Sequence, residues 1–183
     1  MKYLVTGGLG VVGSLLVKRL LGEGHEVEVI DACDAPRNEW TRARLLDSSG
    51  GSLTVYQERL EKFYGLNRVV ASVDAIVHAA ASTGIPYSAE NPGGDWVSNV
   101  DATRRLLEAL RHSGRKIPTV VMSSVKPYRV EPMPETGVSE LAPLEPDEPY
   151  AASKASQSML AMAWARSYDL PIGKTNRLYV END

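Results

Sequence analysis

The chain has 183 residues, of which 43% are hydrophobic and 23% charged, and this is the composition of an ordinary globular domain. Its formal net charge of −3 does not provide the basic surface of a nucleic-acid-binding domain. Because no apolar run approaches the roughly 20 residues of a membrane span and the single Cys33 cannot form an internal disulfide, we expect a cytoplasmic protein with no membrane partner.

Apolar runs of strand length alternate with helical patterns from the N-terminus onward. Residues 3–6 are predicted to form a buried strand and residues 26–31 a second one, with a helix over 12–21 between them. The polar stretch 32–52 is expected to be a loop that contains one helix.

The same alternation continues through the second half of the chain. Further strands are expected over residues 52–57, 73–81, 117–124 and 171–180, and further helices over 97–114 and 149–169. The proline-rich residues 127–149 are predicted to form a shaped loop. Alternating strands and helices with right-handed crossovers predict the α/β class, with a doubly wound parallel sheet and helices on both faces.

The segment "TGGLGVVG" joins the first strand to the first helix through closely spaced glycines. It can be aligned as Gly7-x-x-Gly10-x-x-Gly13 or as Gly8-x-Gly10-x-x-Gly13. The missing side chains would let a tight turn form and a pyrophosphate approach, while the helix N-terminus offers N–H groups to phosphates. The alternative is a glycine-rich turn that only needs positive φ.

Asp31 ends the second strand, close to the roughly 20-residue spacing from the glycines that is expected of a ribose-binding acid. A carboxylate there accepts hydrogen bonds from ribose hydroxyls and repels a 2′-phosphate. It therefore favours NAD over NADP, although Arg37 nearby would weaken that preference. The alternative is a turn residue at a strand end.

With these motifs and several later ones, the sequence resembles the extended short-chain dehydrogenase/reductase family, in its NAD-dependent nucleotide-sugar epimerase/dehydratase branch. The later segments are "VDAIVHAAA", "SNV", "MSSVKPY" and "ELAPLEPDEPYAASK", which follow the order of the family. The resemblance implies a Rossmann fold whose NAD is bound by Gly7, Gly10, Val11, Val12, Gly13, Asp31, Ala32, Ala79, Ala80, Ala81, Asn99, Tyr150 and Lys154.

Tyr150 and Lys154 are predicted to be the catalytic pair, together with Ser124. They are four residues apart, so they share one face of a helix. A lysine ammonium and a positive nicotinamide would lower the pKa of the tyrosine, which could then take a proton from an alcohol as its carbon loses hydride. The resemblance implies that Ser124 orients the reacting oxygen. A tyrosine and a lysine at this spacing are otherwise ordinary surface or packing residues.

Other side chains give weaker predictions. Ser82 and Thr83 follow the fourth strand at the edge where open α/β sheets bind ligands, and with Ser124 and Tyr150 they are the expected substrate contacts. Glu58 stands where the family has an aspartate near the adenine, although the surrounding "YQERLE" departs from the family pattern.

No metal site is expected, and Cys33 is predicted to pack near the adenosine rather than to react. The histidines lack the spacing of metal ligands; they are His25, His78 and His112.

Two departures from the family bear on the reaction. Val125 and Lys126 follow Ser124 where the family's dehydratases place acids, and this favours an epimerase or a reductase. Family members also continue into a smaller substrate lobe, whereas this chain stops at Asp183. We therefore expect residues 1–183 to form a single NAD-binding Rossmann domain that is truncated at its C-terminal end or is a natural short relative.

The favoured function is an NAD-dependent, epimerase-like protein that acts on a nucleotide sugar by transient hydride transfer. One alternative is an NAD-binding module without turnover. The other is a reductase or dehydrogenase of another small hydroxyl or carbonyl substrate.

A homodimer through the 101–112 and 150–167 helices is also expected, since the second helix is apolar on more than one side. The side chains in question are Met159, Leu160, Met162 and Trp164, and the alternative is that they fill the domain's own core.

Overall fold

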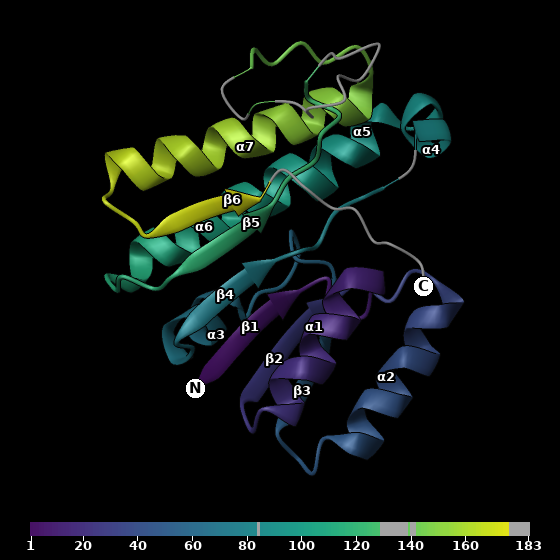
Figure 1. The fold of residues 1–183 in the computed structure, drawn as a ribbon, viewed down its shortest axis with the longest axis vertical. Helices are drawn as coiled ribbons and strands as arrows, with labels where there is room; N and C mark the ends of the chain where they lie inside the picture. Colours follow the sequence, from purple (N-terminus) through teal and green to yellow (C-terminus); the bar gives the residue numbers. More distant parts are fainter. Residues whose placement is uncertain (84, 129–138, 140–141, 176–183) are drawn as a thin grey trace.

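The computed structural model describes residues 1–83, 85–128, 139 and 142–175. They form a six-stranded sheet in the order β3-β2-β1-β4-β5-β6 (Figure 1). The strands are β1 (Lys2–Thr6), β2 (Glu26–Asp31), β3 (Leu53–Gln57), β4 (Ala75–His78), β5 (Thr119–Met122) and β6 (Ile172–Thr175). All neighbouring strands are parallel, which confirms the predicted doubly wound sheet.

Helices connect the strands as the sequence pattern predicts, with additions around the fourth strand. The helices are α1 (Val11–Gly22), α2 (Pro36–Ser48), α3 (Leu66–Ser72), α4 (Ile85–Glu90), α5 (Pro92–Asp95), the π-helical η1 (Trp96–Asp101), α6 (Ala102–Ser113) and α7 (Pro149–Ser167). The helix expected over 97–114 therefore begins as a π-helical turn. Residues 176–180 of the expected sixth strand lie outside the described residues, as do 129–138 and 140–141 of the expected loop.

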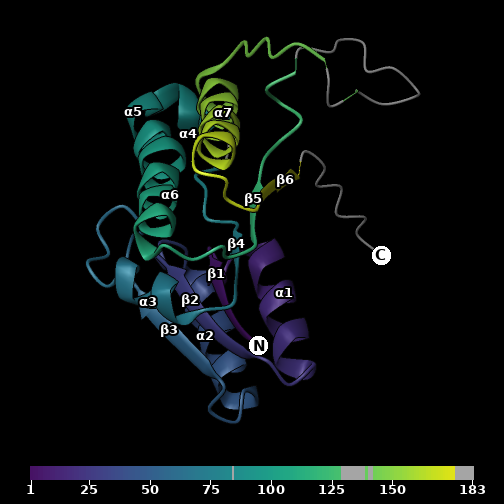
Figure 2. The same cartoon turned by 90° about the vertical axis from the view of Figure 1, so that its left-hand side faces the viewer.

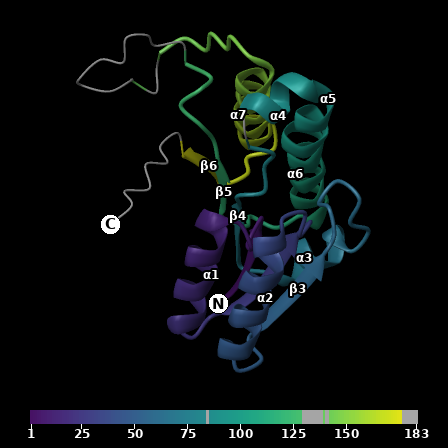
Figure 3. The same ribbon diagram turned by 90° about the vertical axis from the view of Figure 1, so that its right-hand side faces the viewer.

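Two hydrophobic cores lie on opposite faces of the sheet. On one face, Leu4 and Ile30 pack with side chains of α3 and α6. On the other, Val5 and Val29 pack beneath α1. Figures 2 and 3 show α1 and α2 on one side of the sheet, with α3 and α6 on the other. Strands that are buried on both faces read as continuous apolar runs, which is why they could be located from the sequence.

The strand order reverses between β1 and β4, and this brings the loops after β1, β2 and β4 to one edge of the sheet. The Gly7 N–H donates to the Ile30 carbonyl at 2.8 Å, and the Ala79 N–H donates to the Thr6 carbonyl at 3.0 Å. Such a reversal in an open α/β sheet forms a crevice outside the carboxyl ends of the strands. In the described part of the chain, no helix combines the length and apolarity of a membrane span.

Candidate active site

A cavity of about 540 Å³ lies at the carboxyl ends of the strands. Of the residues singled out in the sequence, its lining brings together Gly7, Gly10, Val11, Val12, Gly13, Asp31, Ala32, Arg37, Glu58, Ala79, Ala80, Ala81, Ser82, Thr83, Tyr150 and Lys154. Asn99 and Ser124 do not line it. The cavity therefore joins the glycine turn, the end of β2 and the start of α7 in one site.

The glycines leave no room for side chains where the turn meets the loop after β4. Gly7 has a φ of +68°, and a Cβ atom there would lie 2.7 Å from the Cα of Ala80. A Cβ on Gly13 would collide with the carbonyl oxygen of Gly7. Gly8 instead faces the core, since its Cβ would lie 2.7 Å from a methyl group of Val29. The first of the two glycine alignments is the one that describes the cavity wall.

The N-terminus of α1 offers unpaired N–H groups to this cavity. Val11, Val12 and Gly13 form the first turn of the helix, where backbone donors have no intrahelical acceptor. Gly10 caps the helix without a side chain, and the first turn carries no acidic residue. The helix dipole adds positive potential at this end, so the turn fits an anionic ligand such as a pyrophosphate.

Asp31 is only 7% exposed and is held at the cavity wall by three donors. Its Oδ2 accepts the Leu9 N–H at 2.9 Å, while Oδ1 accepts the Cys33 N–H at 2.9 Å and Asn38 Nδ2 at 3.2 Å. The Cys33 thiol packs against the core beneath α1, and burial raises its pKa, as is typical of a packing cysteine. Asn38, which the sequence analysis missed, fixes the orientation of the carboxylate.

Lys154 lies at the bottom of the cavity and is 2% exposed. Its ammonium donates to the Met122 carbonyl at 2.8 Å and to Oε1 of Gln157. Burial lowers the pKa of Lys154 to about 8. These two hydrogen bonds hold the ammonium of Lys154 near the end of β5. Gln157, one turn further along α7, positions the lysine and was not predicted from the sequence.

Tyr150 lines the same cavity, but its electrostatic environment differs from the expected one. Burial raises the pKa of the phenol, and the carboxylates of Asp95 and Glu148 raise it further. A hydrogen bond with the Ser124 side chain acts in the opposite direction. Lys154 is not among the causes of this shift, since its ammonium is bonded to Met122 and Gln157. The lowering of the Tyr150 pKa by the lysine together with a positive nicotinamide stays a prediction.

A chain of buried hydrogen bonds links Gln157 to the loop after β4. Gln157 Nε2 donates to Thr103 Oγ1 at 2.8 Å, and Thr103 Oγ1 lies 2.8 Å from His78 Nε2. His78 Nδ1 lies 2.6 Å from Thr6 Oγ1, which accepts the Ala80 N–H at 3.2 Å. The network therefore connects α7, α6, β4 and β1 beneath the cavity.

The protons in this network have one consistent arrangement. Thr103 donates its hydroxyl proton to the Asn99 carbonyl at 2.6 Å, so the contact with His78 Nε2 requires His78 to be the donor there. Nδ1 of His78 is then an acceptor for the Thr6 hydroxyl. Full burial and the nearby Lys154 lower the pKa of His78 to about 3, which agrees with this neutral imidazole.

Asn99, which the resemblance placed at the cofactor, lies behind the cavity wall and is fully buried. Its Oδ1 accepts the Ser82 N–H at 2.8 Å, while Nδ2 donates to the Ser82 carbonyl at 3.3 Å and to Ser153 Oγ at 2.9 Å. Because both ends of the amide are occupied by protein, Asn99 positions the loop after β4 and docks it on α7.

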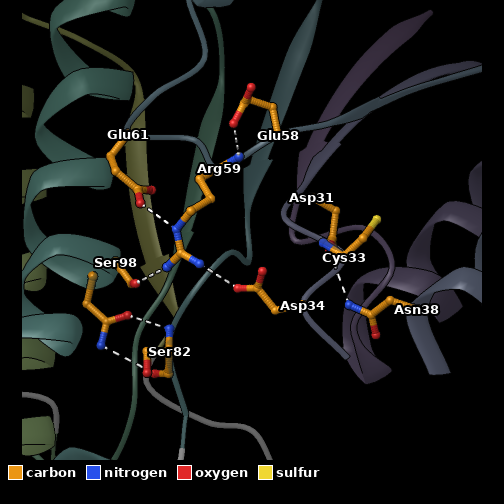
Figure 4. Close-up of polar contacts among 10 residues, drawn as sticks. Asp31, Cys33, Asp34, Asn38, Glu58, Arg59, Glu61, Ser82 and Ser98 are labelled. Atoms are coloured by element: carbon orange, nitrogen blue, oxygen red, sulfur yellow. Dashed lines mark hydrogen bonds and ion pairs between the residues drawn. The ribbon is translucent and has the colours of Figure 1, made fainter. Parts of the chain in front are cut away.

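The cavity also extends over the loops that follow β2 and β3, beyond the predicted set. Asp34, Arg59, Glu61 and Ser98 line it there and are joined through the Arg59 side chain (Figure 4). The positions of Asp34, Arg59 and Glu61 just after the carboxyl ends of β2 and β3 are the signal that could have found them, whereas Ser98 lies in η1 and has no such signal. Among the described residues, no group of three or more His, Cys, Asp or Glu side chains could hold a metal ion.

Comparisons with known proteins agree with this geometry. The model of the family described as the NAD dependent epimerase/dehydratase family matches residues 3–176. A dTDP-glucose 4,6-dehydratase of Mycobacterium tuberculosis is 31% identical over 92% of this chain and 50% of its own length. A UDP-glucose 4-epimerase of Streptomyces lividans is 34% identical over 92% of this chain and 49% of its own length.

A solved structure shares the fold. A double mutant of the dTDP-glucose 4,6-dehydratase DesIV from Streptomyces venezuelae, solved with NAD bound, matches with a TM-score of 0.85 and 32% identity, over 96% of this chain and 55% of that one. The chain thus spans about half the length of the relatives that it matches.

Proposed function

The chain belongs to the NAD-dependent epimerase/dehydratase family, and on this premise we propose that its cavity binds NAD and serves the epimerisation of a nucleotide sugar by transient hydride transfer. One observation carries the proposal. A side-chain-free glycine turn, the buried carboxylate of Asp31 and the Tyr150–Lys154 pair all line one cavity at the strand-order reversal.

The residues present fit NAD from end to end. Gly7 and Gly13 leave a cradle that a Cβ would fill, and the N–H groups of Val11 and Val12 suit the pyrophosphate. With three protein donors bound, Asp31 keeps one acceptor position on Oδ2 for a ribose hydroxyl, and its charge opposes a 2′-phosphate. We propose that Glu58, which also lines the cavity, approaches the adenine.

Bound NAD supplies hydride chemistry, and the chain's own residues handle the proton. Tyr150 takes the proton of the substrate hydroxyl, and Ser124 orients that oxygen through its hydrogen bond with Tyr150. Since burial raises the pKa of Tyr150, a cation must approach the phenol before it acts as a base. Lys154 lines the same cavity one helical turn along α7, and turning its ammonium from the Met122 carbonyl toward Tyr150 would provide that charge.

The substrate is proposed by likeness to relatives whose names specify nucleotide sugars. Ser82 and Thr83 line the cavity and are the proposed sugar contacts, together with Ser124 and Tyr150. An epimerase is favoured over a dehydratase because Val125 and Lys126 follow Ser124, and a valine side chain cannot transfer a proton. A reductase or dehydrogenase of another small hydroxyl or carbonyl compound would use the same groups.

An NAD-binding module without turnover is the second candidate. The raised pKa of Tyr150 and the hydrogen bonds of the Lys154 ammonium to Met122 and Gln157 favour this alternative. It differs from the enzyme in that it binds NAD but transfers neither hydride nor proton from a substrate.

Turnover separates the two candidates. The chain is incubated with NAD and with UDP-glucose or dTDP-glucose, and the C4 epimer is sought by NMR. We expect epimer to form, and Tyr150→Phe to slow its formation by about 10²–10⁴ while NAD affinity stays nearly unchanged. NAD binding without any epimer contradicts the enzyme and supports the module, and full turnover by Tyr150→Phe removes Tyr150 from the role of base.

We further propose that residues 1–183 act as one Rossmann domain in a reducing, cytoplasmic setting, which the unpaired Cys33 supports. A homodimer is also proposed. Leu160 and Trp164 pack partly against the chain's own core, whereas Met159 on α7 is 58% exposed and Trp96 on η1 is 49% exposed. These exposed apolar side chains support a second copy as the partner.

A further inference from the structure

Arg59 lies just beyond β3, and each of the three nitrogens of its guanidinium donates one hydrogen bond (Figure 4). Nε donates to Glu61 Oε1 at 2.8 Å, Nη1 to Asp34 Oδ2 at 2.5 Å, and Nη2 to Ser98 Oγ at 3.2 Å. The partners belong to three separate segments, namely the loop after β3, the loop after β2 and η1. All of them line the cavity, so the side chain of Arg59 joins three segments of its wall.

The bonding pattern decides which kind of ligand this guanidinium can meet. A guanidinium has five N–H donors in its own plane, so these three bonds leave two N–H groups at the edge, together with the two flat faces, for contact. The Arg59 side chain is 37% exposed. The carboxylates of Asp34 and Glu61 place two negative charges beside the one positive charge of Arg59, which disfavours an anion, whereas a neutral heteroaromatic ring can stack on a face without breaking any of these bonds.

The neighbours place this face at the adenosine end of the cavity. Asp34 comes three residues after Asp31, the proposed ribose ligand. Ala35 and Leu60 line the cavity beside Asp34 and Arg59, and supply apolar surface at the same end. A planar base bound next to the ribose therefore meets apolar walls and a fixed guanidinium.

We propose that Arg59 is a purine clamp, in which the guanidinium, held across the cavity by Asp34, Glu61 and Ser98, stacks on the adenine of bound NAD and determines the preference for a purine base. The inference rests on the proposed NAD site and deepens it. Arg59 is a binding residue in this role and takes no part in proton transfer.

The test compares a purine dinucleotide with a pyrimidine one. The full chain is titrated calorimetrically with NAD and with nicotinamide cytosine dinucleotide, whose smaller base offers less area for stacking. We expect NAD to bind more tightly, and Arg59→Met to weaken NAD by about 3- to 30-fold while weakening the cytosine analogue much less. Arg59→Lys, which keeps the charge and loses the planar fork, is expected to show the same reduced ratio.

Arg19→Met is the matched control, because it removes one positive charge from an arginine that is also paired with a carboxylate but does not line the cavity. It should leave the ratio of the two affinities unchanged, and circular dichroism confirms that each variant is folded. If the Arg59 variants lost equal affinity for both dinucleotides, Arg59 would only hold the loops in place, and the proposed stacking on adenine would be wrong. If the unaltered chain binds neither dinucleotide, the proposed NAD site itself fails, which is a distinguishable result.

Discussion

Two buried polar residues, Asp95 and His78, are expected to have measurable effects on the stability of the protein. The carboxylate of Asp95 is 1% exposed, and neither oxygen has a hydrogen-bond partner among the described residues. A buried carboxylate without partners lowers stability, since it has lost its hydration. The negative charge of Asp95 also raises the pKa of Tyr150.

Asp95→Asn is therefore expected to stabilise the protein, since it removes the charge and nearly keeps the volume. A gain of about 1 kcal/mol would raise the melting temperature by about 2–4 °C in a chain of this size. Thermal unfolding followed by circular dichroism at pH 7 measures the change. A lower melting temperature would show that Asp95 has a stabilising partner.

Because of His78, the free energy of unfolding is expected to depend on pH. Its pKa falls from 6.5 to about 3 on folding, so the unfolded chain binds this proton at a higher pH than the folded one. The stabilisation is fully present above pH 6.5 and is lost as the pH falls toward 3, amounting to about 2 kcal/mol between pH 7 and pH 5. Urea unfolding at the two pH values should show this loss.

His78→Gln is the variant that isolates this effect from the titration of carboxylates. Its stability at pH 7 should fall by about 1–3 kcal/mol, because Thr6 and Thr103 lose a buried partner. The further loss between pH 7 and pH 5 should shrink. An unchanged pH dependence would contradict a neutral, buried His78.

At the scale of elements, the contact between α1 and β1 depends on the glycine turn. Gly13→Ala would drive a methyl group into the Gly7 carbonyl, which is backbone and cannot move aside. We expect a loss of about 1–3 kcal/mol and weaker NAD binding. Urea unfolding and NAD titration measure the two effects.

Gly22→Ala is the matched control on the same helix. Nothing lies within 4 Å of a Cβ there, so this variant should be neutral or more stable by about 0.4–1 kcal/mol. If both variants behaved alike, close packing at Gly13 would not explain the motif.

The sequence was informative where one pattern dominates an element. Apolar runs located β1 and β4, which are inner strands with helices on both faces. The strands β2 and β3 also contain polar residues, and β2 was located from an alternating stretch that becomes apolar. Short elements were missed, since the four residues of α5 and the seven of α3 hold too few turns to show a helical period. The π-helical turn of η1 has no distinct sequence signal either.

The residues of the candidate site also differ in how well the sequence predicts them. The glycines, Asp31 and the Tyr150–Lys154 pair could be predicted because each belongs to a motif with a fixed local spacing. The roles of Arg59 and Gln157 could not, since each depends on which loops or helices lie alongside it in the fold.

At the scale of the whole molecule, the proposed homodimer can be measured directly. We expect light scattering coupled to size exclusion to give the dimer mass at micromolar concentration, and Met159→Glu to shift it toward the monomer. Leu15→Glu, on α1 across the sheet, is the control because Leu15 is similarly exposed. A monodisperse monomer of the unaltered chain would rule the dimer out.

The central claim is that the cavity at the carboxyl ends of β1, β2 and β4 is an NAD site whose specificity comes from Asp31. Calorimetric titration of the unaltered chain with NAD and with NADP tests this most directly, with Asp31→Ala alongside. We expect NAD to bind more tightly than NADP, and Asp31→Ala to lose much of that preference because it removes both the ribose acceptor and the charge that opposes a 2′-phosphate. Equal or reversed affinities for the two dinucleotides in the unaltered chain would contradict the account.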